Sequence, residues 1–503
     1  MQALRENPRV AGIVRTAPLY LLSFAVLWWI LLVGRLVIQR HNSYATFDFD
    51  LGIHDQSLWL LAHGKWFNTV CGLNVFGHHA MFMYYVLVPL VWLGRGPNTW
   101  NVLQVIALGS SAIPLFLMAR RKLANEYIAL GVAVAWLLVP TTTWLAWETF
   151  HPEVMAVPFL LAGIHMAQCR PEGTGRHVRN HNIATVAWLA VAMLWKEDIA
   201  LAVMGLGIIL MVRGRRRFGL AVAVGAAAYF AFVGLWMVPA LTGEISAYGN
   251  LYGDLGRTPL EVLKNSVVHP SRFFTRLDNN NALDYGFQIV RPWSFLPLLS
   301  PLTLLMMVPQ FFINILGVYN FTWAIKFHYQ AVPFAISAVA AVEGLALLKR
   351  HGGKAGRYAI VAVLVSGFSW SVARGALPFS REYGPAVWGQ RNSYGDGFDA
   401  ARKRIGPDDV ISVHYLLVPH MSQREVVYSF PNPWIRANFL STPDRYVPLG
   451  EVKWIVMITD QIDEQSKTLI DGLVKSGEFG DAETIGGVTS YRRLSPPRPQ
   501  STP

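Results

Sequence analysis

The most chemically suggestive residues of the sequence are three carboxylates that follow the first long apolar segment. The stretch FDFDLGIHDQSLW, residues 47–59, contains Asp48, Asp50 and Asp55. A carboxylate within hydrogen-bond reach of a hydroxyl can take its proton during group transfer, and Asp50 is the candidate base, with Asp48 and Asp55 as alternatives. Asp48 and Asp50 in DFD can instead converge on a divalent cation such as Mg²⁺, Mn²⁺ or Ca²⁺. The remaining interpretation is a solvated loop, or Asp48 as the cap of a short helix.

Further polar residues occur at the ends of apolar segments. They are His78, His79, His151, Glu153, Lys196, Glu197, Arg291, His328 and Tyr329. Charged side chains at such depth are costly and are usually functional or paired, so we take these residues as candidate binders of a phosphate-bearing substrate. The alternatives are an internal ion pair of Lys196 with Glu197 or a neighbour, a snorkelling Arg291, and interfacial histidines. A zinc site made by His78 and His79 alone is disfavoured, because adjacent helical residues point apart.

The elements that must position these residues are membrane-spanning helices. The chain has 503 residues, of which 53% are hydrophobic and only 15% charged, with a mean hydropathy of +0.33. Soluble domains have about a quarter charged residues, so the composition indicates a polytopic membrane protein. The net charge of +12 comes from short basic tracts between apolar segments. Such tracts are typical of topology signals rather than of nucleic-acid binding.

Eleven segments are apolar enough to be membrane spans in an α-helical polytopic fold. They are 17–38, 98–119, 124–140, 153–169, 183–196, 198–213, 218–240, 293–306, 307–319, 331–348 and 357–374. The first is too long for a signal peptide and is expected to remain as an anchor. Residues 293–319 contain Pro297, Pro301 and Pro309, which predicts a helical hairpin or a broken helix.

The basic tracts set the expected orientation. If the N-terminus and every basic tract lie in the cytoplasm, residues 79–93 must form a helix on the membrane surface rather than a span. The first loop, residues 39–97, and the C-terminal residues then lie outside the cytoplasm. We therefore expect a multi-pass protein of the inner (plasma) membrane with a cytoplasmic N-terminus.

The C-terminal part is more polar than the rest. Strand-like stretches DVISVHYLL and VKWIVMI and the helix-like stretch DEQSKTLIDGLVKSG predict a small α/β domain over residues 375–495. The predicted organisation is a transmembrane domain (1–374), this extracytoplasmic domain, and a disordered tail (496–503).

Six stretches resemble, in the same order, a bacterial family of polytopic membrane proteins known as domain of unknown function 2079. They are FDLGIHDQSLWLLAHGKW (49–66), GHHAMFMYYVLVPL (77–90), FHPEVMAVPFLL (150–161), WKEDIAL (195–201), FHYQAVPF (327–334) and VPHMSQREVVYSFP (418–431). An acidic first loop between an anchor and a surface helix also resembles the GT-C glycosyltransferase superfamily, whose members take sugar from a polyprenyl-phosphate carrier. Asp50 matches the superfamily's first-loop acid.

The resemblance implies a GT-C-like fold and an inverting sugar transfer from a polyprenyl-phosphate donor. The acceptor would be a glycan, lipid or protein of the cell envelope, on the outer face of the membrane. Two alternatives stay open: a transporter or flippase of lipid-linked or small solutes, and a non-catalytic envelope scaffold. The sequence contains no Walker loop, which argues against an ATP-driven pump.

Overall fold

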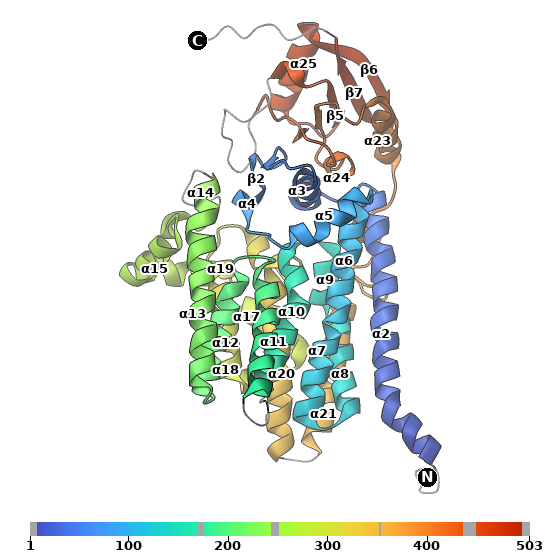
Figure 1. The fold of residues 1–503 in the computed structure, drawn as a ribbon. Coiled ribbons are helices and arrows are strands. Elements are labelled where there is room, and N and C mark those ends of the chain that lie inside the picture. The colour runs from blue at the N-terminus through green and yellow to red at the C-terminus, as the bar shows by residue number, and fades with distance from the viewer. Residues whose placement is uncertain are drawn as a thin grey trace.

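A bundle of long helices makes up most of the molecule, and a small β-sheet sits at one end of it (Figure 1). The computed structural model describes residues 8–169, 171, 175–242, 251–351, 354–435 and 449–494. We call the end that carries the C-terminal sheet the sheet end. The opposite end, where the first helix begins at Pro8, is the distal end.

The helices of the bundle follow the apolar segments of the sequence. They are α2 (Pro8–Asn42), α6 (Pro97–Ser110), α7 (Ala112–Leu123), α8 (Glu126–Leu138), α9 (Pro140–Trp147), α10 (Pro152–Gln168), α11 (Arg176–Met193), α12 (Ile199–Val212), α13 (Arg216–Phe232), α20 (Ala331–His351) and α21 (Ala355–Arg374). Their facing sides share one apolar core that includes Trp29, Trp100 and Trp136. Burial of this apolar surface between helices fixes the ends of the helices relative to one another.

Five helical segments of the described chain are both long and apolar enough to cross a bilayer. They are Thr16–Asn42, Pro97–Leu123, Arg216–Thr242, His328–Arg350 and Gly356–Arg374, and the bent pair α8 and α9 makes a sixth if it counts as one span. Helical residues also occupy the other predicted segments, but several of these helices are shorter, such as the 14 residues of α12. The total of eleven spans therefore stays a prediction.

The proline-rich stretch 293–319 is a broken helix rather than a hairpin of two spans. It consists of η4 (Arg291–Trp293), η5 (Leu296–Leu299), α18 (Pro301–Leu304), η6 (Leu305–Met307) and α19 (Val308–Ile315). Pro297, Pro301 and Pro309 each stand in the first turn of one piece. Proline lacks the N–H that would continue a preceding helix, and so it starts a new one.

The first loop forms a layer between the bundle and the C-terminal sheet (Figure 1). It contains the π-helix η1 (Asp48–Gly52), α3 (Ile53–Ala62), the hairpin of β1 (Phe67–Asn68) and β2 (Leu73–Asn74), α4 (Val75–His78) and α5 (Tyr84–Trp92). The nine residues of α5 extend only about 14 Å at 1.5 Å per residue. A bilayer core of about 30 Å is twice that length, so α5 is too short to be a span.

Helix α13 continues through η2 (Val233–Met237) and α14 (Val238–Thr242), which complete the segment Arg216–Thr242. Shorter helices follow before α20, namely η3 (Gly253–Leu255), α15 (Pro259–Val268), α16 (Pro270–Asn279), α17 (Ala282–Val290), η7 (Asn320–Thr322) and η8 (His328–Gln330). The last of these directly precedes α20 and carries two of the polar candidates into the sheet end of the bundle.

The C-terminal residues form a mixed five-stranded sheet in the order β4-β3-β5-β7-β6. Its strands are β3 (Ile411–Val413), β4 (Val427–Ser429), β5 (Trp454–Ile458), β6 (Phe479–Ile485) and β7 (Val488–Arg493), with helices α22 (Pro385–Trp388), α23 (Ser393–Arg404), α24 (Val418–Met421), η10 (Leu449–Glu451) and α25 (Glu464–Lys475). Strand β3 pairs in parallel with β4 and β5, and β7 pairs antiparallel with β5 and β6. Strands β3 and β5 and helix α25 fall in the stretches whose patterns predict them.

The C-terminal sheet shares its core with the first loop. Tyr44, Ile53 and Val70 pack in one apolar cluster with Ile411 and Val413 of β3 and their neighbours. The backbone of edge strand β4 is also capped from the loop, since the Thr69 hydroxyl donates to Val427 O at 2.8 Å and accepts from Val427 N at 3.0 Å. The predicted domain boundary at 375 stays a prediction, and the shared core ties residues 375–494 to the loop.

Candidate functional site

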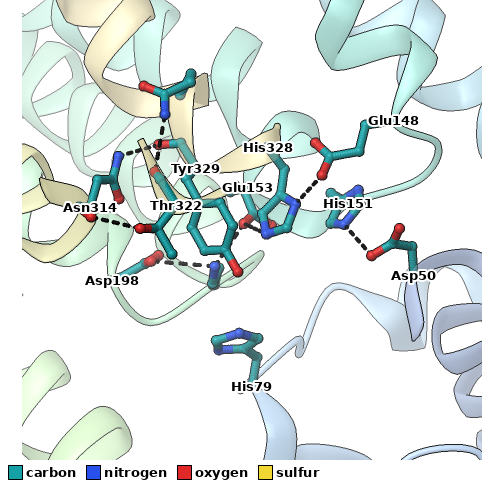
Figure 2. Close-up of polar contacts among 12 residues, drawn as sticks. Asp50, His79, Glu148, His151, Glu153, Asp198, Asn314, Thr322, His328 and Tyr329 are labelled. Carbon is teal, nitrogen blue, oxygen red and sulfur yellow. Dashed lines mark hydrogen bonds and ion pairs between the residues drawn. The ribbon is translucent and has the colours of Figure 1, made fainter. Parts of the chain in front are cut away.

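Four separate segments bring carboxylates, histidines and a lysine together at the sheet end of the bundle (Figure 2). These segments are η1 of the first loop, the turn between α9 and α10, the connection from α11 to α12, and η8 before α20. Each lies at a helix terminus, where the chain leaves the apolar core and polar side chains can meet.

A chain of four residues forms the centre of this cluster (Figure 2). Asp50 Oδ1 lies 3.4 Å from His151 Nε2. The His151 ring stacks on the His328 ring at a centroid distance of 3.9 Å and an interplanar angle of 16°. His328 Nδ1 lies 2.8 Å from Glu148 Oε1, so the two histidines are held between carboxylates.

The turn that presents Glu148 and His151 is held from beneath by α6. Thr149 has a left-handed backbone with φ +84°. Gln104 Oε1 accepts a hydrogen bond from His151 N at 2.6 Å, while its amide nitrogen donates to Leu145 O at 2.7 Å and to Thr149 O. A threonine adopts a positive φ only where its surroundings enforce it, so these contacts fix the positions of Glu148 and His151.

A second polar group surrounds Lys196. Its ammonium donates to Glu153 Oε1 at 2.7 Å and lies 3.4 Å from Asp198 Oδ2. Glu153 Oε1 is also 3.6 Å from His328 Nε2, which joins this group to the central chain. The ring of Tyr329 lies 4.0 Å from that of His328.

The first loop contributes three histidines to the same region. His79 Nδ1 lies 2.7 Å from Glu197 Oε1, and Glu197 Oε2 accepts from Ala80 N at 3.0 Å. His54 hydrogen-bonds the Tyr84 hydroxyl at 2.6 Å and meets His151 edge to face at 5.5 Å. His78 lies next to His79, with ring centroids 4.6 Å apart.

The electrostatics of the central pair favour opposite charges. Burial alone would raise the pKa of Asp50, but the contact with His151 and the positive charges of His151 and His328 outweigh it and lower this pKa. Burial alone would lower the pKa of His151, but the carboxylates of Glu148 and Asp50 raise it to about 9. At neutral pH the pair therefore consists of a carboxylate and an imidazolium. Asp50 keeps 27% of its side chain exposed and is accessible from outside the cluster.

The second group is also ionised. Although burial lowers the pKa of Lys196, the charges of Asp198, Glu153 and Glu197 raise it well above its ordinary value. Burial raises the pKa of Glu197, but His79 and Lys196 together lower it to about 2. Lys196 is therefore compensated by Glu153 and by its neighbour Asp198, whereas Glu197 pairs with His79.

Glu148, His151 and His328 are arranged as possible ligands of a metal ion. Among the described residues they form the one group whose ligand atoms all lie within 4.8 Å of one another. Glu148 Oε2 is buried and has no hydrogen-bond partner in the described part of the chain, which is the state expected of an oxygen prepared for a cation. Two imidazoles and one carboxylate suit zinc or another first-row transition metal. Binding through His151 would release its proton.

The structure does not bring all of the predicted residues into this cluster. Asp48 accepts a hydrogen bond from Phe49 N at 2.8 Å and lies near Ser429 and Tyr415 of the C-terminal part. A site for Mg²⁺, Mn²⁺ or Ca²⁺ made by Asp48 and Asp50 stays a prediction. The guanidinium of Arg291 rests 4.3 Å from the ring centroid of Trp370 on α21, outside the cluster.

Asp55 is a structural residue rather than a member of the cluster. It is fully buried and accepts hydrogen bonds from Trp100 Nε1 at 2.6 Å, Ser422 Oγ at 2.6 Å and Gln423 Nε2 at 3.2 Å. It thereby joins the first loop to α6 and to the C-terminal residues. The interpretation of Asp55 as an alternative base does not fit these contacts, because its oxygens already have three donors.

Two buried residues near Asp50, Arg40 and Glu148, were not among the candidates from the sequence. Arg40, at the end of α2, is only 2% exposed, and its guanidinium lies 4.2 Å from the ring centroid of Trp147. It interacts electrostatically with Asp50 and Glu148. Its Nε and Nη1 have no hydrogen-bond partner among the described residues. The sequence offered one signal for each: Arg40 is a charged residue shortly before the acidic loop, and Glu148 stands in the stretch WETFHPE beside His151 and Glu153.

A family profile with the description "Predicted membrane protein (DUF2079)" matches residues 40–471. The match includes every residue of the cluster described above. No curated protein matches the chain in a comparison of sequences.

Solved structures that resemble this chain include ArnT and an oligosaccharyltransferase, which are GT-C glycosyltransferases. ArnT from Cupriavidus metallidurans bound to undecaprenyl phosphate is 16% identical, with a TM-score of 0.55 over 95% of this chain and 98% of that chain. Its apo state gives a TM-score of 0.52 over 93% and 98%, again at 16% identity. The oligosaccharyltransferase of Archaeoglobus fulgidus in complex with Zn and sulfate is 12% identical, with a TM-score of 0.46 over 93% and 73%. The likeness to ArnT shows a shared fold.

Proposed function

We propose a function for this chain, which belongs to the DUF2079 family of predicted membrane proteins, on the premise of that membership and of its GT-C-like fold. The proposed function is transfer of a sugar from a polyprenyl-phosphate carrier to an acceptor of the cell envelope. The acceptor is a glycan, lipid or protein with a free hydroxyl.

One observation carries this proposal: Asp50, with 27% of its side chain exposed, stands at the edge of a buried cluster of carboxylates, histidines and a lysine. The cluster lies at the sheet end of a fold shared with a protein that was solved with undecaprenyl phosphate bound. A carboxylate that is ionised and reachable, beside cations that can meet a phosphate, is what sugar transfer from a lipid phosphate requires.

In the proposed reaction the acceptor hydroxyl attacks the anomeric carbon of the sugar. The bond between this carbon and the phosphate oxygen breaks, and the polyprenyl phosphate leaves with the bonding electrons. Attack from the face opposite the phosphate inverts the anomeric configuration. Asp50 orients the hydroxyl and accepts its proton, and His151 holds the Asp50 carboxylate in position.

The leaving phosphate would be met by the positive side of the cluster. His79 and His328 are partly exposed, at 17% and 14% of their side chains, and are the phosphate contacts we favour. Lys196 holds Glu153 in place beside His328, and Tyr329 lies next to His328. The positive charge of Arg40 partly offsets the negative charges of Asp50 and Glu148.

Glu148, His151 and His328 would hold a metal ion, if one binds. Such an ion would supply Lewis-acid stabilisation of the departing phosphate. The orphaned Glu148 oxygen and the two imidazoles make zinc a better fit than the magnesium, manganese or calcium expected from Asp48 and Asp50.

The proposed location is the inner membrane, with the sheet end outside the cytoplasm. The tracts at 119–122 and 213–217 and the end of α20 place positive charge at the distal end of the bundle. The positive-inside rule assigns that end to the cytoplasm.

Reconstitution tests this function directly. The purified full-length chain is placed in liposomes with lipid-linked sugars and envelope acceptor, both extracted from a deletion strain in which they accumulate. We expect sugar to appear on the acceptor while free polyprenyl phosphate is released in equal amount. Movement of the lipid-linked sugar across the bilayer without release of polyprenyl phosphate would refute the proposal and favour a flippase.

A further inference from the structure

The distal end of the bundle contains a cavity that the proposed reaction does not use. It has a volume of about 590 Å³ and is lined by residues of α7, α10, α12, α20 and the loop that contains Ser300. Its lining residues come from the ends of α7, α10 and α20 that lie at the distal end of the bundle, whereas the Asp50 cluster lies at the sheet end, so the cavity is not part of the same site. Figure 1 shows these two ends of the helices.

The charge of this cavity is strongly positive. Its lining includes Arg121, Lys122, Arg213, Arg215 and Arg350, with Glu343 as the one carboxylate among the described lining residues. Five cations against one anion leave an excess of four positive charges. An excess of that size inside a concave surface attracts an anion much more strongly than the same charges on an open face.

Glu343 organises the floor of the cavity rather than neutralising it. It accepts from Arg213 at 2.9 Å and 2.8 Å, from Lys122 at 3.2 Å and from Ser300 at 2.7 Å. Arg215 is fixed separately by Ala167 O at 2.6 Å and Asn182 Oδ1 at 2.7 Å. These contacts hold the lower cations in place, and an ordered array of donors of this kind binds phosphate well.

Two arginines at the mouth of the cavity remain available. Arg121 and Arg350 are exposed and make no hydrogen bond or ion pair with the described residues. Gln168 Oε1, also in the lining, is buried without a partner in that part of the chain and is able to accept from a hydroxyl. The opening therefore offers cations for a phosphate and an acceptor for a hydroxyl group.

The remaining walls are apolar. Leu206, Ile209 and Leu210 line the inner wall, and Leu299 and Leu347 are exposed beside the opening. A free phosphate makes no favourable contact with apolar walls. A lipid has both an anionic head group for the cations and a hydrocarbon tail for these walls. Basic pockets between membrane helices are common sites for anionic head groups.

We propose that this cavity is a binding site for an anionic glycerophospholipid, whose phosphodiester contacts the arginines and whose head-group hydroxyl reaches Gln168. Phosphatidylglycerol is the probe with this chemistry. The lipid would stabilise the distal ends of α7, α10, α12 and α20 relative to one another, at a distance from the Asp50 cluster.

Native mass spectrometry of the full-length protein in detergent tests this proposal, with phosphatidylglycerol, phosphatidylethanolamine, undecaprenyl phosphate and inorganic phosphate as separate additions. The test variant is Arg121→Gln with Arg350→Gln. The matched control is Arg216→Gln with Arg217→Gln, which removes the same charge from two exposed residues outside the cavity. A circular dichroism spectrum and a melting curve show that each variant is folded, and Arg350→Gln alone replaces the double variant if it is not.

We expect the wild type and the control to prefer phosphatidylglycerol over phosphatidylethanolamine. The test variant should bind phosphatidylglycerol at least about tenfold more weakly than the wild type does. Equal weakening in both double variants would overturn the proposal, because it would show a general effect of charge. Displacement of phosphatidylglycerol by inorganic phosphate, or one-for-one by undecaprenyl phosphate at lower concentration, would also overturn it and assign the cavity to that ligand.

Discussion

Replacement of the buried Asp55 by asparagine gives a sharp test of how the first loop is joined to the rest of the molecule. The Asp55 carboxylate is fully buried, and burial raises its pKa from 3.8 to about 6 in spite of the hydrogen bonds from Ser422 and Trp100. Asparagine has nearly the same shape. Its oxygen can still accept from Trp100, and its amide can donate to the Ser422 hydroxyl, so the contacts survive without the charge.

The sign of the pH dependence follows from the raised pKa. The folded protein binds the Asp55 proton more tightly than the unfolded chain, so the carboxyl contributes its full stability below about pH 4. That contribution is lost as the pH rises through about 6. A pKa difference of about two units corresponds to roughly 3 kcal/mol of folding stability at 1.36 kcal/mol per unit. The wild type loses this stability as the pH rises, and the variant does not.

Thermal unfolding of the full-length protein in detergent, between pH 4.5 and 8, measures this difference. We expect Asp55→Asn to have a melting temperature close to that of the wild type at pH 4.5 and higher than that of the wild type at pH 8. Asp471→Asn, an exposed position on α25, is the control and is expected to follow the wild type at every pH. A variant that is less stable than the wild type at pH 8, or a difference that does not change with pH, would refute the reasoning.

Three further predictions concern the metal, the C-terminal residues and the orientation. Glu148→Gln and His328→Gln should each lower the amount of zinc retained after loading and dialysis by at least about tenfold, measured by elemental analysis; unchanged retention would exclude this site. The fragment 375–494 should be digested rapidly by protease when expressed alone, because its core includes side chains of the first loop; a protease-resistant fragment would show that it folds independently. In a chain without its native cysteines, an impermeant thiol reagent added to whole cells should label Ser476→Cys but not Arg216→Cys; the reverse pattern would invert the proposed topology.

The sequence was sufficient to predict most helices and several members of the candidate site. Apolar periodicity located the helical segments, and the position of each polar residue at the end of such a segment indicated that they gather at one membrane face. Asp50, His151 and His328 meet there, although they are far apart in the sequence. Helix ends on the same side of a bundle must be neighbours, which is why topology alone predicted this meeting.

The finer pairings could not be predicted, because they depend on how single turns are built. The left-handed Thr149 and its contacts with Gln104 aim Glu148 at His328, and no sequence pattern marks that turn. The same holds for Asp48 and Asp55, which adjoin Asp50 in sequence but face the C-terminal residues in the π-helix and in α3. The three aspartates therefore resemble one site in the sequence, but the fold places each of them in a different environment.

The measurement that tests the central proposal most directly is the rate of sugar transfer by Asp50→Asn. The control is Asp48→Asn, which makes the same substitution two residues away. We reconstitute the wild type and both variants with lipid-linked sugar and acceptor, and follow the release of polyprenyl phosphate in a single turnover. Loss of the base should slow Asp50→Asn by roughly 10²–10⁴-fold while binding of the lipid-linked sugar persists, and Asp48→Asn should lose far less. A correctly inserted Asp50→Asn protein that transfers sugar at nearly the wild-type rate would contradict the assignment of Asp50 as the base.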